Sequence, residues 1–290
     1  MQAELVLDSQ ATLGEGPIWS AREQCLYWVD IEAGFLHTFD PHANEDRISE
    51  LGEMIGTVVP RRSEGVMLAM HHGFAAYDPH TATLTRWSDP EAHLPRNRFN
   101  DGKCDPAGRF WAGTLSLDRQ SNAASLYCLE ADGRVRTMLQ GVTNSNGIAW
   151  SLDSRAMYYI DTPTLRVTRF DYDLLSGQIT NPRTVITIPA GAGKPDGMTI
   201  DADGMLWIAL WGGGCVGRWD PHTGECLARI EVPARQVTAC AFGGPDLTDL
   251  YITTARIGLS EVDLAAQPSA GGLFRARPGL AGVPAFEFAG

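Results

Sequence analysis

A unit of about 45 residues occurs six times along the chain, and this repeat constrains the fold more than any other feature of the sequence. Each unit has a polar residue, a short apolar strand, a turn, and a second strand that carries Tyr or Trp. The clear copies are GEGPIW at Gly14, NDGKC at Asn100, SNGIAW at Ser145 and PDGMTI at Pro195, and the weaker ones are TVVP at Thr57 and TACAF at Thr238. This period is typical of β-propeller blades rather than of leucine-rich or ankyrin repeats.

The polar residue at the head of each unit fixes the register of the repeat. The heads, which follow one another at intervals of 42, 44, 45, 50 and 42 residues, are Glu15, Thr57, Asp101, Asn146, Asp196 and Thr238. Further turn segments, such as YDPH at Tyr77 and WDPH at Trp219, lie where the third and fourth strands of a four-stranded blade would join. The sequence therefore predicts an all-β fold, one six-bladed β-propeller domain over residues 1–290 with four-stranded antiparallel blades around a central channel. Residues 4–7 can pair into the last blade and close the ring.

The six heads are expected to meet on the channel axis. The innermost strand of each propeller blade runs along the channel, so the residue that begins it points inward near one mouth. Carboxylates that converge in this way repel one another unless a cation lies between them. Oxygen ligands without Cys or His suit a hard cation such as Ca²⁺, Mg²⁺ or Mn²⁺ better than Zn²⁺ or Fe²⁺. We therefore interpret the heads as a divalent-cation site; the alternative is a set of polar residues that solvate a wet channel.

Four other patterns have plainer interpretations. The DPH tripeptides at 40–42, 78–80 and 220–222 resemble metal motifs, but they fall at blade edges and are expected to form turns. DADG at Asp201 lacks the spacing and terminal Glu of an EF-hand loop, so we expect a simple turn there. The Trp and Tyr residues of the second strands are expected to pack between blades. The six cysteines form no CxxC pair, and we expect them to be reduced thiols rather than disulfides or metal ligands.

Composition excludes several classes of partner. The net charge is −12 and there is no basic cluster, which argues against nucleic acid and against anionic membrane surfaces. No apolar run is long enough for a membrane span, and the N-terminus lacks the basic start and apolar stretch of a secretion signal. We expect a soluble, cytoplasmic monomer that binds cations or neutral small molecules.

Four motifs, in this order, resemble the SMP-30/gluconolactonase family, which includes regucalcin and bacterial sugar lactonases. They are LGEGPIW at Leu13, RFNDGKCDPAGRFWAGT at Arg98, NSNGIAWSLD at Asn144 and PDGMTIDADGMLW at Pro195. The segments ALWGGG at Ala209 and FGGPDLTDLYITTAR at Phe242 are similar to the bacterial aldonolactonases of the family, and the resemblance spans residues 10–275. It implies a six-bladed propeller that binds one divalent cation in its channel and hydrolyses sugar lactones such as glucono-, xylono- or arabinonolactone.

The resemblance also implies the ligands and the residues that bind the substrate. Glu15, Asn146 and Asp196 correspond to the metal ligands of the family. Arg98 and Asn100 correspond to residues that contact the oxygens of the substrate. By ligand type Ca²⁺ is the preferred ion, with Mn²⁺, Mg²⁺, Zn²⁺ and Fe²⁺ as alternatives.

The remaining site residues have less settled roles. Asp118 falls where some members use a Glu to bind substrate, and its side chain is one methylene shorter. Asp196 is the first choice for general base because a carboxylate at the metal can reach a water held there, and Asp101 in the second motif is the alternative. Trp211 either stacks on a sugar face or packs within the fifth blade.

The sequence also bears on three other functions. A calcium-binding regulatory protein without catalysis would use the same ligands. An interaction platform of the WD type is disfavoured, because the Gly-His and Trp-Asp signatures are missing from the repeat positions. Other metal-dependent propellers hydrolyse organophosphates or aryl esters, and a His near the metal would point to them, but no His heads a blade.

Overall fold

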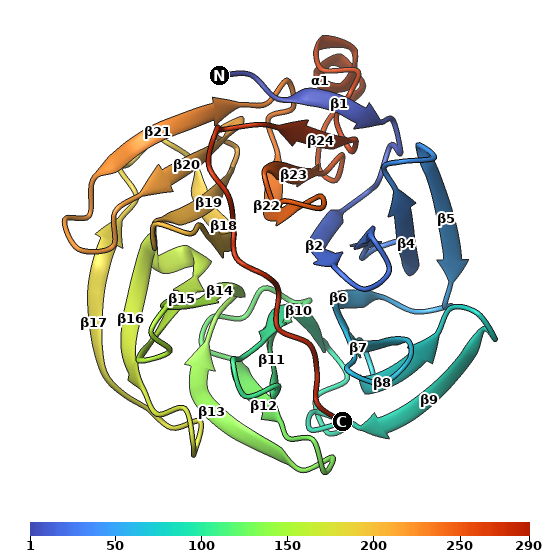
Figure 1. Ribbon diagram of the computed structural model, residues 1–290, viewed down its shortest axis with the longest axis vertical. Helices are drawn as coiled ribbons and strands as arrows, with labels where there is room; N and C mark the ends of the chain where they lie inside the picture. Colours follow the sequence, from blue (N-terminus) through green and yellow to red (C-terminus); the bar gives the residue numbers. More distant parts are fainter.

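The protein is a ring of six four-stranded antiparallel sheets around a central channel, as seen in a computed structural model that describes residues 1–290 (Figure 1). Consecutive strands form the first five blades, and the sixth combines strands from both ends of the chain. The predicted six-bladed β-propeller is confirmed, as is its division into blades of four strands.

Each blade contributes one strand to each of four concentric layers. The innermost strands are β2 (Gly14–Ser20), β6 (Ile55–Pro60), β10 (Asn97–Cys104), β14 (Ser145–Trp150), β18 (Lys194–Ile200) and β22 (Val237–Gly243). The second strands are β3 (Cys25–Asp30), β7 (Val66–Met70), β11 (Phe110–Ser116), β15 (Ala156–Asp161), β19 (Leu206–Trp211) and β23 (Asp249–Thr254). The third strands are β4 (Phe35–Asp40), β8 (Gly73–Asp78), β12 (Ala124–Leu129), β16 (Arg166–Tyr172), β20 (Cys215–Trp219) and β24 (Leu273–Ala276). The outermost strands are β5 (Glu45–Glu50), β9 (Thr83–Ser88), β13 (Val135–Val142), β17 (Ile179–Thr187), β21 (Cys226–Glu231) and β1 (Glu4–Leu7).

Helices are few and short. They are the 3-10 turn η1 (Thr162–Thr164) and the helix α1 (Glu261–Ala266), which begins with a capping box at Ser260. Neither has the length and apolar character needed to cross a bilayer.

The ring closes through the N-terminal strand, as predicted. β1 pairs antiparallel with β24, and Glu4 lies opposite Arg275 in the register. The Arg275 guanidinium contacts the Glu4 carboxylate at 2.6 Å. The first strand of the chain thus completes the last blade and covers its outer edge, which would otherwise carry unpaired backbone groups.

The DPH segments form turns between third and fourth strands, as predicted. In each turn the Asp side chain accepts a hydrogen bond from the backbone N–H of the His two residues later. The distances are 2.8 Å for Asp40–His42, 2.8 Å for Asp78–His80 and 2.7 Å for Asp220–His222. All six cysteines are unpaired, in agreement with the expectation of reduced thiols.

Aromatic residues of the second strands pack between neighbouring blades, as predicted. Trp111 of the third blade meets Trp150 of the fourth edge to face, with ring centroids 6.0 Å apart. Trp207 of the fifth blade meets Phe242 of the sixth in the same way at 5.9 Å. Each such pair contributes about 0.5–1.5 kcal/mol of stability beyond the contribution of the surface that it buries. The blades therefore hold one another in place around the channel.

The turn at DADG has a buried anchor that the sequence did not reveal. Asp201 has no exposed surface, and its Oδ2 accepts hydrogen bonds from Trp207 Nε1 (2.9 Å) and Arg218 Nε (2.7 Å). Asp105 in the third blade accepts in the same way from Trp111 Nε1 (2.9 Å). The segment is a turn, as predicted, and its aspartate also ties the first strand of the blade to the second and third.

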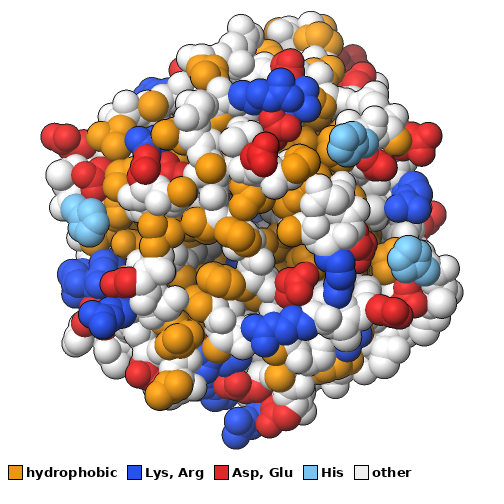
Figure 2. Space-filling model, in the orientation of Figure 1, with side chains coloured by type: hydrophobic (Ala, Val, Ile, Leu, Met, Phe, Trp, Pro, Cys, Tyr) orange, Lys and Arg blue, Asp and Glu red, His pale blue; other side chains and the backbone are white.

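A C-terminal tail, residues 277–290, crosses one end of the channel (Figure 1). It leaves the sixth blade and ends beside the second and third, where Phe288 N–H donates to Pro60 O (2.8 Å) and Ala289 N–H to Gly108 O (2.9 Å). Hydrophobic side chains gather across the middle of this face (Figure 2). Beneath residues 283–286 lies a largely apolar cavity of about 260 Å³. The tail therefore covers the channel at the C-terminal ends of the innermost strands, opposite the mouth at which the heads lie.

We expect Phe288→Ala to lower the free energy of unfolding by about 3–5 kcal/mol, the usual cost of removing a buried Phe side chain. Phe288 is fully buried and meets Trp87 edge to face, with centroids 5.5 Å apart. Phe286, on the same tail, is 38% exposed and serves as the matched control. Urea unfolding of both variants tests this, and equal losses for the two would contradict it.

Candidate metal and substrate site in the channel

A break in strand pairing aims each head residue into the channel. In all six innermost strands the register shifts at the head, between Glu15/Ile18, Ile55/Thr57, Phe99/Gly102, Asn146/Ile148, Pro195/Met198 and Val237/Ala239. Such bulges bend a strand and re-aim its side chains. The glycines that follow permit this geometry: Gly16 has a φ of +54°, and a Cβ on Gly147 would lie 2.6 Å from Asp196 O.

Five of the six predicted metal-binding and substrate-binding residues come together at one mouth of the channel. They are buried, each with 3–6% of its surface exposed: Glu15, Arg98, Asn100, Asn146 and Asp196. All five line one cavity of about 960 Å³, which opens at this mouth. They come from four different blades, so only the assembled ring creates the site.

The two threonine heads have a structural role. Thr57 Oγ1 donates to Gly102 O (3.1 Å), and Thr238 Oγ1 donates to Gly14 O (2.5 Å). Each bond joins the innermost strands of adjacent blades. These hydroxyls therefore hold the ring together, and the oxygen-rich part of the channel is formed by the other four heads.

Asn146 is held with its carbonyl oxygen free. Its Nδ2 donates to Thr162 Oγ1 (3.0 Å), and that hydroxyl in turn donates to Pro195 O (2.9 Å). Asn146 Oδ1 is buried and has no hydrogen-bond partner. A buried acceptor without a donor costs free energy, so this oxygen fits a ligand or cation in the cavity.

The acidic side chains are close enough to affect one another. Burial raises the pKa of Glu15 well above its ordinary value, and repulsion from Asp196 and Asp101 raises it further. Burial also raises the pKa of Asp196 well above its ordinary value; a hydrogen bond with Asn146 lowers it in part, and the Asp101 charge raises it. A bound cation would remove this penalty. No three Asp, Glu, His or Cys side chains group as a metal site, and the predicted ligand set is instead two carboxylates and one amide.

These pKa shifts predict that the metal-free protein loses stability as pH rises. A carboxyl with a higher pKa in the folded than in the unfolded chain contributes stability below its unfolded-state pKa, which is lost as pH rises through the folded-state value. In urea unfolding with a chelator, we expect stability to fall more steeply for the wild type than for Glu15→Gln/Asp196→Asn as pH rises above the unfolded-state carboxyl pKa of about 4. A saturating divalent cation should flatten the wild-type curve. Identical curves for the two chelated proteins would contradict this.

Arg98 and Asn100 form a linked pair at the cavity wall. Arg98 Nη1 donates to Asn100 Oδ1 (2.8 Å) and to Phe99 O (2.8 Å). The Asn100 amide group donates hydrogen bonds within the protein, to Ser145 O (2.8 Å) and to Asn144 Oδ1 (3.3 Å). Arg98 Nε is buried without a partner. Arg98 is therefore the donor available to a ligand, and Asn100 mainly holds it in place.

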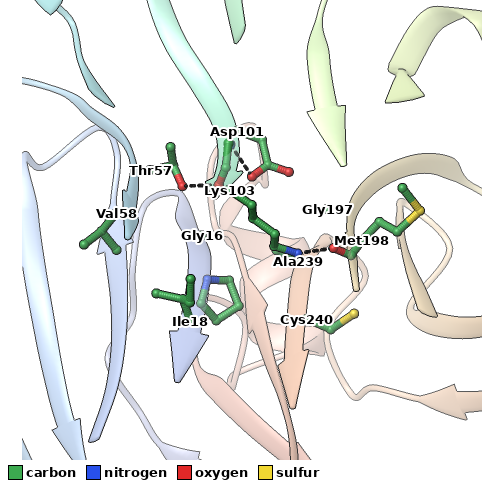
Figure 3. A pocket seen from close by; sticks show the side chains of 12 residues that line it. Gly16, Ile18, Thr57, Val58, Asp101, Lys103, Gly197, Met198, Ala239 and Cys240 are labelled. Carbon is green, nitrogen blue, oxygen red and sulfur yellow. Dashed lines mark hydrogen bonds between the residues drawn. The ribbon is translucent and has the colours of Figure 1, made fainter. Parts of the chain in front are cut away.

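Asp101 lies deeper in the channel than the other acidic heads. It lines a small inner cavity together with Lys103 and Thr57, and it is not part of the mouth cavity (Figure 3). Burial raises the pKa of Asp101, and the nearby Lys103 charge lowers it in part. The Lys103 ammonium donates to Met198 O on β18. Sequence reasoning missed Lys103, although it follows Asp101 by two residues on one strand.

The structure does not bring Asp118 into the site. Its carboxylate pairs with Arg96 at 2.8 Å on the surface, and both side chains are largely exposed. Asp118 does not line the mouth cavity, whereas its neighbour Arg119 does. The sugar contact of Asp118 stays a prediction, and in this structure the Asp118 carboxylate pairs with Arg96 instead.

Residues two positions before the heads form much of the cavity wall, and sequence reasoning did not identify them as a group. They are Leu13, Asn144, Lys194 and Gln236. Their spacing offered a signal, since alternate residues of a strand share a face. Trp211 also lines the mouth cavity and is half-buried, as the stacking interpretation requires.

Fold and site together define a propeller with a cavity at one end of its channel that is lined by charged residues of both signs. Residues 13–256 match the family described as the SMP-30/Gluconolactonase/LRE-like region, and the chain belongs to this family. YvrE of Bacillus subtilis, which its name provisionally calls a sugar lactone lactonase, is 42% identical over 290 residues, covering 100% of this chain and 99% of its own. Regucalcin of Danio rerio is 39% identical over 293 residues, covering 100% and 99%. A solved structure of regucalcin from Agrobacterium tumefaciens, described as a calcium-binding protein, matches with a TM-score of 0.94 at 29% identity, covering 99% of this chain and 97% of that one.

Proposed function

We propose that the protein is a metal-dependent hydrolase that opens sugar lactones to aldonic acids. The observation that carries this proposal is the free Oδ1 of Asn146, buried in one cavity with Glu15, Asp196 and the unpartnered Nε of Arg98. This combination offers oxygen ligands for a hard cation beside a fixed positive charge. The name of the Bacillus subtilis relative and the family description support the same chemistry.

Glu15, Asn146 and Asp196 would hold the cation, and their oxygen-only chemistry favours Ca²⁺ over Mn²⁺, Mg²⁺, Zn²⁺ or Fe²⁺. When bound, the ion supplies Lewis-acid polarisation of the lactone carbonyl and lowers the pKa of a nearby water. It would also relieve the repulsion between the two buried carboxylates. Three protein ligands would leave coordination positions open for substrate and water, because Ca²⁺ takes 6–8 oxygen ligands.

The other residues orient the lactone and move the proton. Arg98 donates through Nε towards the carbonyl oxygen, where negative charge develops in the tetrahedral intermediate. Asn100 keeps the guanidinium in position. Asp196 lines the same cavity; it takes the proton from the attacking water and gives it to the ring oxygen that leaves when the C–O bond of the lactone breaks. Asp101, which lines the small inner cavity with Lys103, is the alternative base. Trp211 offers an apolar face to the sugar ring.

A second function is a calcium-binding role without catalysis. The Danio rerio and Agrobacterium relatives are named regucalcin, and the latter is described as calcium-binding. The same three ligands would serve both functions.

Rates of lactone opening, measured by pH-stat against spontaneous hydrolysis, test the proposal. Glucono-, xylono- and arabinonolactone form the panel, and an aryl ester serves as a counter-substrate. We expect at least one lactone to open well above background and the aryl ester to be a poorer substrate. If no lactone opens above background with any of the five cations, the proposal fails and the binding role becomes the leading account.

A further inference from the structure

The mouth cavity continues sideways into a second cavity of about 550 Å³ on the side of the fifth and sixth blades. The two cavities share five lining residues: Leu165, Lys194, Trp211, Gln236 and Gly258. Cavities of about 300–1,000 Å³ hold drug-sized ligands. The mouth cavity alone is near the upper end of that range, so one sugar ring would leave much of the joined space to water.

Gln236, at the junction of the two cavities, has a buried polar atom without a partner. The residue is 9% exposed, and its Oε1 makes no hydrogen bond within the protein. An unpaired buried amide oxygen is costly, and few such atoms occur in a native protein. The amide can accept a hydrogen bond from one hydroxyl and donate to another, which suits a polyol.

Trp211 stands beside this amide. It ends β19, and its backbone forms an isolated antiparallel bridge with Gln236. Its half-buried side chain lines both cavities. A flat apolar ring next to a free amide matches a pyranose, which has an apolar face and a polar edge.

The residues that line the second cavity leave room for a ligand and carry charges of both signs. Four of its lining residues are glycines: Gly191, Gly193, Gly212 and Gly258. At Gly191, Gly212 and Gly258 an added Cβ would meet no atom within 4 Å. The charged lining residues are Lys194, Arg235 and Asp263, which carry both signs. A neutral occupant therefore fits better than a highly charged one.

We propose that this extension is a subsite for a second sugar ring, so that the protein accepts lactones of oxidised disaccharides as well as of single sugars. This inference rests on the proposed lactonase function. The lactone ring would occupy the acid-lined part of the mouth, and the glycosidic substituent would extend towards Gln236 and Trp211.

The test compares kcat/KM for cellobiono-1,5-lactone with kcat/KM for glucono-1,5-lactone. In the wild type we expect the disaccharide lactone to be opened at least as efficiently. Gln236→Leu should lower the ratio of the two kcat/KM values about tenfold, the effect of one lost hydrogen bond. Gln140→Leu, the same exchange at an exposed position on β13, is the matched control and should leave the ratio unchanged.

A measurement on the wild type alone covers the case in which a variant does not fold. Cellobionate should inhibit gluconolactone opening at a lower concentration than gluconate does. If gluconolactone is opened but the disaccharide lactone is about 100-fold poorer and cellobionate inhibits no better than gluconate, the subsite is wrong and the lactonase function stands. If neither lactone is opened above background, the proposed function fails, and this inference fails with it.

Discussion

Asp196→Asn is expected to lower kcat for lactone opening by about 10³-fold or more, because loss of a general base alone costs about 10²–10⁴-fold. The substitution keeps the shape of the side chain but removes both the charge and the ability to accept a proton. Asp196 is buried in the mouth cavity, where no other carboxylate except Glu15 and the exposed Glu32 lines the wall. Kinetics at saturating cation, on protein whose folding is confirmed by thermal unfolding, provide the measurement.

Two comparisons make this result specific. Asp246→Asn, at an exposed turn of the sixth blade, is the matched control and should keep full activity. Asp101→Asn separates the two candidate bases: we expect a smaller loss of kcat than for Asp196→Asn. The reverse order would assign the base to Asp101 and leave Asp196 as a ligand only.

Asn146→Leu is expected to raise the dissociation constant of the cation at least about 100-fold, since loss of outer-shell partners alone costs about 10- to 100-fold. Leucine nearly matches asparagine in volume but has no oxygen to offer. In the wild type, cation at 100 times its dissociation constant should raise the free energy of unfolding by about 2.7 kcal/mol. The same concentration should leave Asn146→Leu almost unchanged, which thermal unfolding and calorimetry both measure.

Two threonine variants test whether cation binding depends on how the Asn146 amide is held. Thr162→Val removes the hydroxyl that holds Asn146 Nδ2 and should weaken cation binding about tenfold. Thr164→Val, in the same 3-10 turn but exposed, should have no effect. If Asn146→Leu binds the cation as tightly as the wild type, Asn146 is not a ligand.

The fold could be predicted from the sequence because the same blade pattern occurs six times along the chain. One copy of the unit, such as TVVP at Thr57, is too weak to identify a blade, but six heads at a nearly constant interval leave few alternatives to a propeller. Ring closure by residues 4–7 was expected as a common device of propellers, and the structure shows it as the pairing of β1 with β24. The C-terminal tail could not be predicted, because its position depends on isolated contacts such as Phe288 with Pro60 rather than on a repeat.

The repeat also predicted part of the candidate site, but it did not predict the contacts of each side chain. Heads at equivalent positions of the repeat converge by symmetry, which predicted Glu15, Asp101, Asn146 and Asp196 as one cluster. The family resemblance then implied Glu15, Asn146 and Asp196 as the ligands. Which partner each side chain selects depends on neighbours from other blades, and sequence spacing does not contain that information. Asn100 illustrates the point, since its amide donates to Ser145 O on the next blade.

The most direct test of the account is a titration of cation into chelated wild-type protein, with bound ion and lactone turnover followed on the same sample. The account predicts one ion per chain and turnover that rises in proportion to occupancy, with Ca²⁺ as the preferred ion. Turnover that persists unchanged after complete chelation would contradict metal dependence. Full occupancy without opening of any lactone would contradict the enzyme itself and identify the channel as a binding site.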